Sequence, residues 1–368
     1  MSTFAIMNTE YVLTHLRYPL IVAEDSYQTL AKILKSDADA GCTFFILVDE
    51  NTHQHCLPQL ITNIEALTSA EIIEIDSGEE HKTLETCTQL WEVLTELGAD
   101  RQSVLINLGG GVITDMGGFV AAAYKRGIRF YNIPTTLLAQ VDASTGSKTG
   151  VDLGGLKNQV GLFADPQAVY INPGFLHTLP TTQLQSGFGE IVKHALIADK
   201  DYWNMVKCEV YYEVVNWGQL IRPSLDIKSN VVLKDPTEKG ARKLLNFGHT
   251  IGHALETFAL ENSRPLLHGQ AVALGMLAEA WLSTKLTGLT TEEFNEIQLV
   301  ILSNFDLFQF EEANFDRIFE LMGHDKKNVS GKVRLTLLSQ IGTGVYDISC
   351  NETLLKESLK YLIALNNN

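Results

Sequence analysis

The chain is 368 residues long, with 45% hydrophobic and 20% charged residues and a formal net charge of −16. This length is sufficient for two domains, and the acidic charge disfavours nucleic acid and anionic membranes as partners. No apolar run approaches the roughly 20 residues of a membrane-spanning helix, no signal peptide is evident, and the five cysteines lack C-x-x-C spacing. We therefore expect a cytoplasmic protein without disulfides or a thiolate metal site.

Short apolar runs alternate with helical patterns in the first half of the chain. Runs typical of buried strands occupy residues 44–49, 71–76, 103–108 and 128–133, and a further run near the sheet edge occupies 19–24. Residues 82–99 carry apolar side chains at helical spacing. This alternation predicts a mostly parallel, Rossmann-like α/β sheet that binds ligands at the carboxyl ends of its strands.

The pattern changes in the second half of the chain. Long helical segments predominate from about residue 175, and a short β signal returns at 332–342. Proline and glycine interrupt both patterns within 171–181. We therefore expect an α/β domain over residues 1–173 and a mostly α-helical domain over residues 174–368.

Three consecutive glycines, Gly109, Gly110 and Gly111, lie between a predicted strand and an alanine-rich helix. Glycines there let the backbone approach a phosphate, and the helix N-terminus offers free N–H groups. The turn is not a true G-x-G-x-x-G, and the absence of G-x-x-x-x-G-K-[ST] disfavours a nucleoside triphosphatase. A tight turn without a ligand remains an alternative. Asp115, which we expect in the first helical turn, would complement the helix dipole or contact a ribose.

The segment 133–161 is polar and rich in glycine, although it lies between predicted strands. Mobile glycine backbone beside lysines is suited to an anionic ligand. We therefore interpret the segment as a functional loop, with a solvated surface loop as the alternative. Its polar residues include Thr135, Thr136, Asp142, Lys148, Lys157 and Asn158.

Histidines and a glutamate in apolar helical segments indicate a metal site. His249 and His253 are four residues apart, so they share one helical face. His268 begins another predicted helix, and Glu190 lies in a third with Lys193 three residues on. One glutamate and two histidines from different helices, with one position open, are typical of catalytic zinc. This pattern does not decide whether His249 or His253 is the ligand, and polar residues satisfied within a helical core remain an alternative.

Arg242, Asn246, His249 and His253 follow one another at 4-3-4 spacing in an otherwise apolar segment. If the segment is one helix, these side chains form a continuous polar stripe. An amphipathic surface helix would instead expose mostly charged residues on that face. We therefore expect the stripe to line a pocket.

Eight segments together closely resemble the 3-dehydroquinate synthases of the sugar phosphate cyclase superfamily. They occur in order at 77–82, 109–127, 134–152, 156–161, 189–197, 244–256, 268–276 and 325–327. The resemblance implies an NAD-binding N-terminal domain, a helical metal- and substrate-binding C-terminal domain, and a homodimer. It implies NAD+ and a divalent metal, usually Zn2+ with Co2+ as an alternative, as cofactors.

The resemblance assigns a role to each matching residue. The implied metal ligands are Glu190, His249 and His268, so that His253 lies beside the substrate. The implied NAD+ contacts are Asp49, Glu79, Lys82, Gly109, Gly110, Gly111, Asp115, Thr135, Thr136, Asp142 and Lys157. The implied substrate contacts are Lys148, Asn158, Lys193, Lys228, Arg242, Asn246, His253 and either Lys326 or Lys327. Arg126 would reach the phosphate of the substrate bound to the neighbouring subunit.

The implied reaction converts 3-deoxy-D-arabino-heptulosonate 7-phosphate to 3-dehydroquinate and phosphate, a step of the shikimate pathway. It proceeds by transient oxidation with NAD+, β-elimination of phosphate, reduction, ring opening and intramolecular aldol closure, without net redox change. The gathered cations would explain how so acidic a chain binds a sugar phosphate.

Three positions depart from the family pattern. Ser147 stands where glycine is usual, Asp152 where asparagine is common, and Leu156 where many members have glycine. Because Lys148, Lys157 and Asn158 are kept, we interpret the departures as loop variation. Three other function classes remain: related cyclases that make 2-deoxy-scyllo-inosose or epi-valiolone, a metal-dependent polyol dehydrogenase, and a non-enzymatic nucleotide-binding protein. Lys228, Arg242, Asn246 and His253 match the dehydroquinate-forming type.

Overall fold

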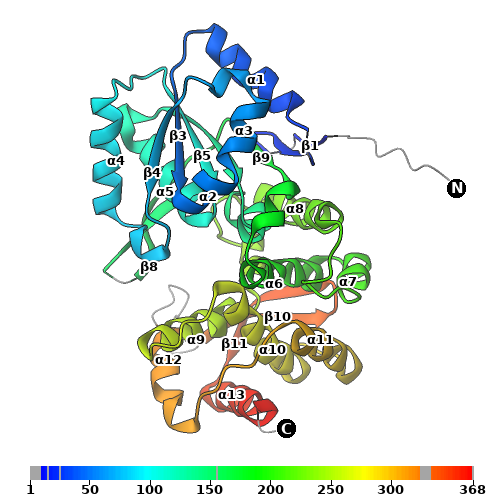
Figure 1. Ribbon diagram of the computed structural model, residues 1–368. Coiled ribbons are helices and arrows are strands. Elements are labelled where there is room, and N and C mark those ends of the chain that lie inside the picture. Colours follow the sequence, from blue (N-terminus) through cyan, green and yellow to red (C-terminus); the bar gives the residue numbers. More distant parts are fainter. Residues whose placement is uncertain (1–9, 15, 25, 155, 324–332, 367–368) are drawn as a thin grey trace, which may run out of the picture. The chain divides into compact units, whose positions relative to one another are not determined.

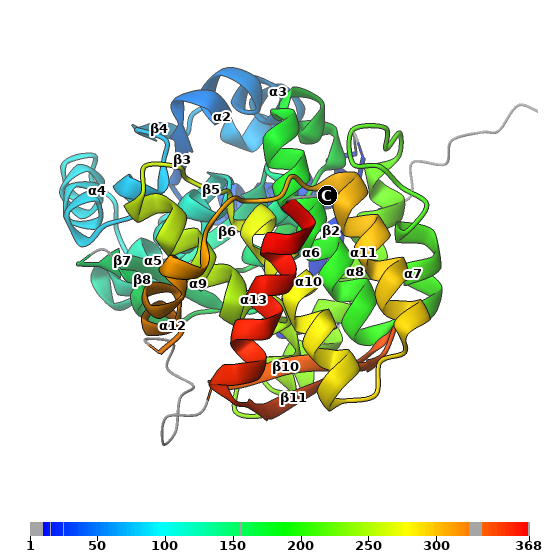
Figure 2. The ribbon, with the colours of Figure 1, turned by 90° about the horizontal axis from the view of Figure 1, so that it is seen from below.

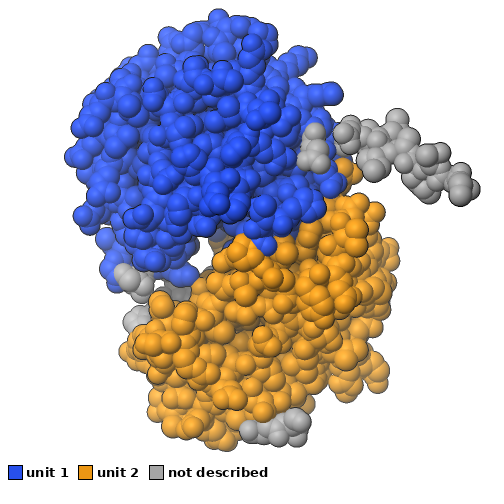
Figure 3. Space-filling model, viewed as in Figure 1, with its two compact units in different colours: residues 1–179 blue, residues 180–368 orange. Residues whose placement is uncertain are grey.

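The computed structural model describes residues 10–14, 16–24, 26–154, 156–323 and 333–366. The chain forms two compact units, residues 1–179 and residues 180–368, which are coloured separately in Figure 3. Figure 1 labels their helices and strands. No helix in the described part of the chain is both long and apolar enough to cross a membrane.

Unit 1 is built on a seven-stranded sheet with the order β1-β2-β9-β6-β5-β3-β4 (Figure 1). All neighbouring pairs are parallel except β1 and β2. The strands expected at 44–49, 71–76, 103–108 and 128–133 are confirmed within one residue at each end. The strands are β1 (Tyr11–Leu13), β2 (Leu20–Val22), β3 (Phe44–Asp49), β4 (Glu71–Ile75), β5 (Val104–Gly109), β6 (Arg129–Pro134) and β9 (Val169–Ile171).

Helices cover both faces of this sheet. Along β3, Ile46 and Val48 join one buried cluster with side chains of α1 and α3, whereas Phe45 and Leu47 join another with side chains of α4 and α5. Side chains alternate between the faces of a strand, so the unbroken apolar run of β3 follows from burial on both sides. The helices are α1 (Gln28–Asp39), α2 (Glu50–His55), α3 (Leu57–Asn63), α4 (Leu84–Glu96) and α5 (Gly111–Ala123).

The segment 133–161, which the sequence predicts to be an irregular loop, is instead largely ordered. It contains a π-helix at Ala139–Ala143 and most of the antiparallel hairpin of β7 (Lys148–Leu153) and β8 (Leu156–Phe163). The prediction is wrong because the strands lack apolar alternation. Gly150 pairs with Gly161, and a side chain at Gly150 would lie 2.7 Å from the carbonyl oxygen of Val160. The close approach of the strands therefore requires glycine where apolar residues would mark a strand.

Unit 2 is mostly helical, as expected, with one antiparallel hairpin where the sequence has its last β signal. Helix α10 contacts α6, α9, α11 and α13, which can be followed in Figure 2. The elements are α6 (Thr181–Ala198), α7 (Lys200–Val206), α8 (Trp217–Lys234), α9 (His249–Glu261), α10 (His268–Leu286), α11 (Thr291–Asn304), α12 (Phe315–Gly323), α13 (Glu352–Asn366), β10 (Val333–Gln340) and β11 (Thr343–Cys350).

Glycines let α10 approach its neighbours at backbone contact distance. A β-carbon on Gly275 would lie 1.9 Å from the carbonyl oxygen of Gly248, and one on Gly269 would lie 1.8 Å from that of Ser186. Neither position accepts a side chain without movement of the backbone. Gly248 precedes His249, and Gly269 follows His268. The closest helix contacts therefore lie beside the predicted metal ligands.

Candidate active site

Several predicted nucleotide contacts of unit 1 lie at the carboxyl edge of its parallel sheet. The register pairs Asp49 with Ile75 and Gly109 with Pro134, so four strands end at this edge. The connection from β3 to β4 runs through α2 and α3 on one face, and that from β5 to β6 runs through α5 on the other. The neighbouring strands β3 and β5 therefore flank a topological switch point, where open α/β sheets bind ligands.

The three glycines lie between a strand and a helix, as the sequence predicts, and this places them beside the switch point. Gly109 ends β5, Gly110 is the N-cap of α5 and Gly111 is the first residue of that helix. Such a turn presents backbone N–H groups and the positive end of a helix dipole to a phosphate. Asp115 lies beyond the first turn of α5, in which no acidic residue is found. The expectation that Asp115 complements the helix dipole is therefore wrong.

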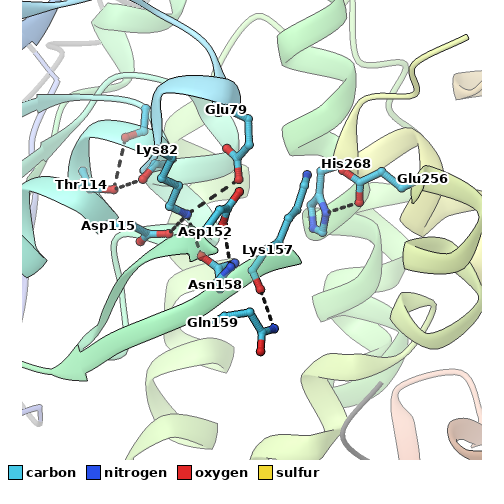
Figure 4. Close-up of polar contacts among 12 residues, drawn as sticks. Glu79, Lys82, Thr114, Asp115, Asp152, Lys157, Asn158, Gln159, Glu256 and His268 are labelled. Carbon is cyan, nitrogen blue, oxygen red and sulfur yellow. Dashed lines mark hydrogen bonds and ion pairs between the residues drawn. The ribbon is translucent and has the colours of Figure 1, made fainter. Parts of the chain in front are cut away.

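Asp115 instead pairs with Lys82, whose ammonium group is the centre of a polar cluster (Figure 4). The Lys82 Nζ lies 2.8 Å from Asp115 Oδ2, 2.8 Å from Asn158 Oδ1 and 3.9 Å from Glu79 Oε1. Burial alone would lower the pKa of Lys82, but the carboxylates of Asp115 and Glu79 outweigh it and raise that pKa. The cluster thus unites three predicted NAD+ contacts with Asn158, which the sequence assigned to the substrate.

The hairpin carries the lysines of the predicted anion-binding segment. Lys148 begins β7, and Lys157 precedes Asn158 in β8; all three residues are exposed. Asn158 has a positive φ of 53°, and its N–H donates a 2.7 Å hydrogen bond to Asp152 Oδ1. An asparagine side chain offers the same acceptor oxygen, so this contact does not require the aspartate that departs from the family pattern.

The other predicted residues of unit 1 come from four elements. Asp49 caps α2, because its carboxylate accepts hydrogen bonds from the N–H and hydroxyl of Thr52. Thr135 and Thr136 follow β6, and Asp142 lies in the π-helix. Arg126 is exposed and has a φ of 72°, beside a φ of 50° at Lys125. Left-handed backbone at non-glycine residues is uncommon and clusters at functional sites.

Unit 2 brings Glu190, His249 and His268 together from α6, α9 and α10. The Glu190 Oε1 lies 3.5 Å from His249 Nε2 and 3.4 Å from His268 Nε2. The other carboxylate oxygen, Oε2, pairs with Lys193. Glu190 is fully buried. One carboxylate and two imidazoles whose donor atoms converge are the ligand set that a catalytic zinc ion uses, so these residues fit a divalent metal.

The remaining ring nitrogens of both histidines face acceptors. His249 Nδ1 lies 3.2 Å from the carbonyl oxygen of Phe247, and His268 Nδ1 lies 3.5 Å from Glu256 Oε2 (Figure 4). Burial, followed by the charge of Lys193, holds the pKa of His249 well below its usual value. Burial also opposes protonation of His268, but Glu190 and Glu256 outweigh it and raise that pKa to about 9. A cation that binds both imidazoles would therefore displace a proton from His268.

His253 lies close to the same group. Its ring centroid is 5.0 Å from that of His249 and 5.5 Å from that of His268, and the three histidines offer ligand atoms within 4.8 Å of one another. His253 is exposed, whereas Glu190 is fully buried. The geometry thus permits a second ligand set in which His253 takes part.

Three cations that the sequence assigned to the substrate are buried in unit 2. Lys193, Lys228 and Arg242 are 1%, 4% and 3% exposed. Arg242 is held by its backbone N–H, which donates to Asp235, and by its guanidinium, which donates to the carbonyl oxygen of Pro236. Burial of cations is costly unless acceptors compensate it, and Lys193 has such a partner in Glu190.

The expected polar stripe is not on one helix. Arg242 and Asn246 belong to a 3-10 helix at Ala241–Asn246, and His249 begins α9. Gly248, between them, has a left-handed φ of 78°. The prediction of one continuous helix is therefore wrong, because periodicity does not register a change of direction at a single glycine. Asn246 donates a 2.9 Å hydrogen bond to Glu238, and Lys326 and Lys327 lie outside the described residues.

Two carboxylates in this region were not singled out from the sequence. Glu256 on α9 contacts His268, and Glu279 on α10 accepts a hydrogen bond from the N–H of Gly248. Each is buried in an otherwise apolar helical segment. Glu256 follows His249 by seven residues, which is two helical turns and the same face. A lone carboxylate on the face of a predicted ligand is the signal that could have identified it.

Comparisons with known proteins identify the family of the chain. Residues 72–186 match the family model described as 3-dehydroquinate synthase N-terminal, and residues 187–328 match 3-dehydroquinate synthase C-terminal. The chain is 43% identical over 319 residues to 3-dehydroquinate synthase of Parabacteroides distasonis, covering 86% of this chain and 88% of the relative. The chain belongs to the 3-dehydroquinate synthase family. The sequence-based predictions of fold class, enzyme class and function are thereby confirmed.

Solved structures of related cyclases share the fold. One is 2-deoxy-scyllo-inosose synthase complexed with carbaglucose-6-phosphate, NAD+ and Co2+, with a TM-score of 0.84, 25% identity, and coverage of 96% of this chain and 99% of that one. Another is 2-epi-5-epi-valiolone synthase from Streptomyces hygroscopicus with NAD+ and Zn2+ bound, with a TM-score of 0.81, 24% identity and the same coverage. Both are the kinds of cyclase that the sequence left as alternatives.

Proposed function

We propose that Glu190, His249 and His268 hold a divalent metal, Zn2+ or Co2+, and that the carboxyl edge of the unit 1 sheet binds NAD+. The single observation that carries the metal site is the position of Glu190 Oε1, within 3.5 Å of both Nε2 atoms. A bound divalent ion would act as a Lewis acid toward substrate hydroxyls. NAD+ would accept a hydride and later return it, which leaves no net redox change.

The buried cations of unit 2 are proposed to bind the anionic groups of 3-deoxy-D-arabino-heptulosonate 7-phosphate. Lys193, Lys228 and Arg242 are each at least nine-tenths buried, and a carboxylate or phosphate of the substrate would form charge-assisted hydrogen bonds with them. Asn246 and His253 would donate or accept at sugar hydroxyls. From outside this group, Lys148, Asn158 and one of Lys326 and Lys327 complete the proposed substrate contacts.

Glu190 is poorly placed to act as a general base. It pairs with Lys193 and contacts both predicted imidazole ligands, so its oxygens are directed at an ammonium group and two imidazole rings. The proton at C6 of the oxidised sugar is therefore proposed to pass to the substrate's own phosphate as the C7–O bond breaks. In that scheme the enzyme's residues hold the substrate in the conformer that allows this transfer.

Arg126 is proposed to act across a homodimer, on the phosphate of the substrate bound to the neighbouring subunit. Its exposed guanidinium and left-handed backbone support this role. Inactive Arg126→Ala and Lys148→Ala subunits should regain activity when mixed, because each mixed dimer contains one site with both residues intact. Mixed dimers with verified subunit exchange but no activity would place Arg126 in its own subunit's site.

The test of the whole proposal is phosphate release. With the heptulosonate phosphate as substrate, the enzyme should release phosphate only when NAD+ is present. Phosphate release should stop when a chelator removes the metal, and NADH should not accumulate. Glucose 6-phosphate and sedoheptulose 7-phosphate serve as the substrates of the related cyclases, and a polyol dehydrogenase would accumulate NADH. Turnover of either alternative sugar but not of the heptulosonate phosphate would reject the proposed substrate.

A further inference from the structure

A carboxylate outside the proposed ligand set contacts one of the ligands. Glu256 Oε2 on α9 lies 3.5 Å from Nδ1 of His268 on α10, as Figure 4 shows. We propose that Glu256 is a positioning residue that orients His268 toward the metal. The inference rests on the metal site of the proposed function and extends it to a residue that does not itself bind the metal.

Glu256 is a largely buried carboxylate among apolar residues. Its side chain is 10% exposed, and its neighbours Leu255, Phe258 and Ala259 are buried apolar residues of the same helix. An ionised carboxylate in such surroundings is unfavourable unless a donor compensates it. His268 supplies a donor from the adjacent helix, so the two groups satisfy one another across the contact between α9 and α10.

The contact also fixes how the imidazole can act. A neutral imidazole has one N–H donor and one acceptor nitrogen. Once a metal has displaced the second proton of His268, an acceptor at Nδ1 keeps the remaining proton there and leaves the lone pair at Nε2, the nitrogen that lies 3.4 Å from Glu190. His249 has the same arrangement, because its Nδ1 faces the carbonyl oxygen of Phe247. Both proposed imidazole ligands are therefore held with Nε2 directed at the same point.

A carboxylate and a carbonyl differ as acceptors in one useful respect. The charge of a carboxylate increases the basicity of the imidazole that donates to it, and such partners typically contribute 10- to 100-fold to metal affinity. Glu256 should therefore strengthen metal binding at His268 both by orienting the imidazole and by increasing its basicity. It also ties the ligand on α10 to the helix that begins with the other histidine ligand.

The experiment compares Zn2+ affinity in the full-length protein by competition with a chromophoric chelator. Glu256→Ala should bind Zn2+ about 10- to 100-fold more weakly, and Glu256→Gln should lie between it and the wild type, because its amide oxygen still accepts from Nδ1. Glu261→Gln is the matched control, since it removes the same charge from an exposed position of the same helix. The visible spectrum of the Co2+-loaded protein should change in Glu256→Gln and not in the control.

Unfolding of the metal-free proteins separates positioning from a general loss of structure. Glu256→Gln should keep the unfolding midpoint of the wild type while losing metal affinity. Equal Zn2+ affinity in the wild type and both Glu256 variants would overturn only the proposed role of Glu256. Loss of affinity only in proportion to the unfolded fraction would do the same. Failure of the wild type to bind Zn2+ would instead overturn the metal site and, with it, the proposed function.

Discussion

The carboxylate of Glu279 on α10 accepts a 2.6 Å hydrogen bond from the backbone N–H of Gly248, one residue before His249. Its other oxygen lies 3.4 Å from the N–H of Ile251. Glu279 is fully buried, so one helix caps the N-terminus of another in the protein interior. A carboxylate there satisfies N–H groups that have no partner within their own helix and complements the helix dipole. The start of α9, and with it His249, is thus fixed from α10.

Replacing Glu279 should destabilise the protein. Glu279→Leu leaves buried N–H groups of α9 without their acceptor, and we expect the free energy of unfolding to fall by about 1–3 kcal/mol. Glu279→Gln keeps one acceptor oxygen and should cost less. Urea denaturation measures the difference, with Glu357→Gln on the exposed face of α13 as the control. A Glu279→Leu midpoint equal to that of the control would show that the contact is not stabilising.

The glycine contacts around α10 give a second prediction. Gly275→Ala would place a β-carbon 1.9 Å from the carbonyl oxygen of Gly248, so α9 and α10 would have to separate. We expect a loss of about 2–3 kcal/mol in stability, together with weaker Zn2+ retention because Gly248 precedes His249. Gly218→Ala in α8 is the control, since the nearest atom to its β-carbon is a side-chain oxygen at 3.2 Å. Gly275→Ala should lower both the stability to unfolding and the metal content, whereas Gly218→Ala should change neither.

Much of unit 1 could be predicted because its strands are buried on both faces. Apolar runs such as Phe44–Asp49 then stand out from polar helix surfaces. The grouping of Glu190, His249 and His268 was also predictable in outline, because they are polar residues in apolar helical segments. The hairpin of β7 and β8 was not, since Gly150 and Gly161 replace the apolar residues that mark a strand.

Other contacts between elements distant in sequence escaped prediction. Lys82 and Asn158 are 76 residues apart, and Gly248 and Glu279 are 31 apart. Spacing along one helix or strand contains no information about such pairs. The break at Gly248 was missed for a related reason, because its left-handed φ depends on the close contact with α10 and its residue type alone permits several conformations. Tertiary contacts therefore determine the parts of the site that local patterns misplace.

The two possible ligand sets predict different metal contents. His249→Ala should lose bound metal, because its Nε2 faces Glu190, whereas His253→Ala should retain metal and lose turnover. Metal content after gel filtration in metal-free buffer, measured by atomic emission, distinguishes them. Comparable metal loss in both variants would mean that His253 is a ligand, in keeping with the close grouping of the three histidines.

Asp235 gives a prediction for the dependence of stability on pH. Burial raises its pKa, but hydrogen bonds from the N–H groups of Lys239, Gly240 and Arg242 outweigh this effect, so the pKa is lowered. A folded-state pKa below the unfolded value of about 3.9 means that the ionised form favours folding. The stabilisation is therefore complete above pH ~4 and is lost as the pH falls through the folded-state pKa.

Asp235→Asn should consequently be less stable than the wild type at neutral pH, and the difference should shrink as the pH is lowered below about 4. Urea denaturation at a series of pH values measures it. Because these hydrogen bonds also hold the loop that contains Arg242, the variant should bind substrate more weakly, seen as a raised KM. A stability difference that stays constant down to the acid limit would show that the charge of Asp235 is not involved.

Ser147 occupies a position where the backbone itself favours glycine. Its φ of 62° is left-handed, and its hydroxyl donates a hydrogen bond to Asp165. Both Ser147→Gly and Ser147→Ala remove that hydrogen bond, but only glycine relieves the contact between Cβ and the backbone that makes this conformation unfavourable. After allowance for the greater entropy of glycine in the unfolded chain, we expect the glycine variant to be about 0.5–1 kcal/mol more stable than the alanine variant. Thermal and urea unfolding of the pair test this directly, and an alanine variant at least as stable as the glycine variant would show that the turn is not strained at this residue.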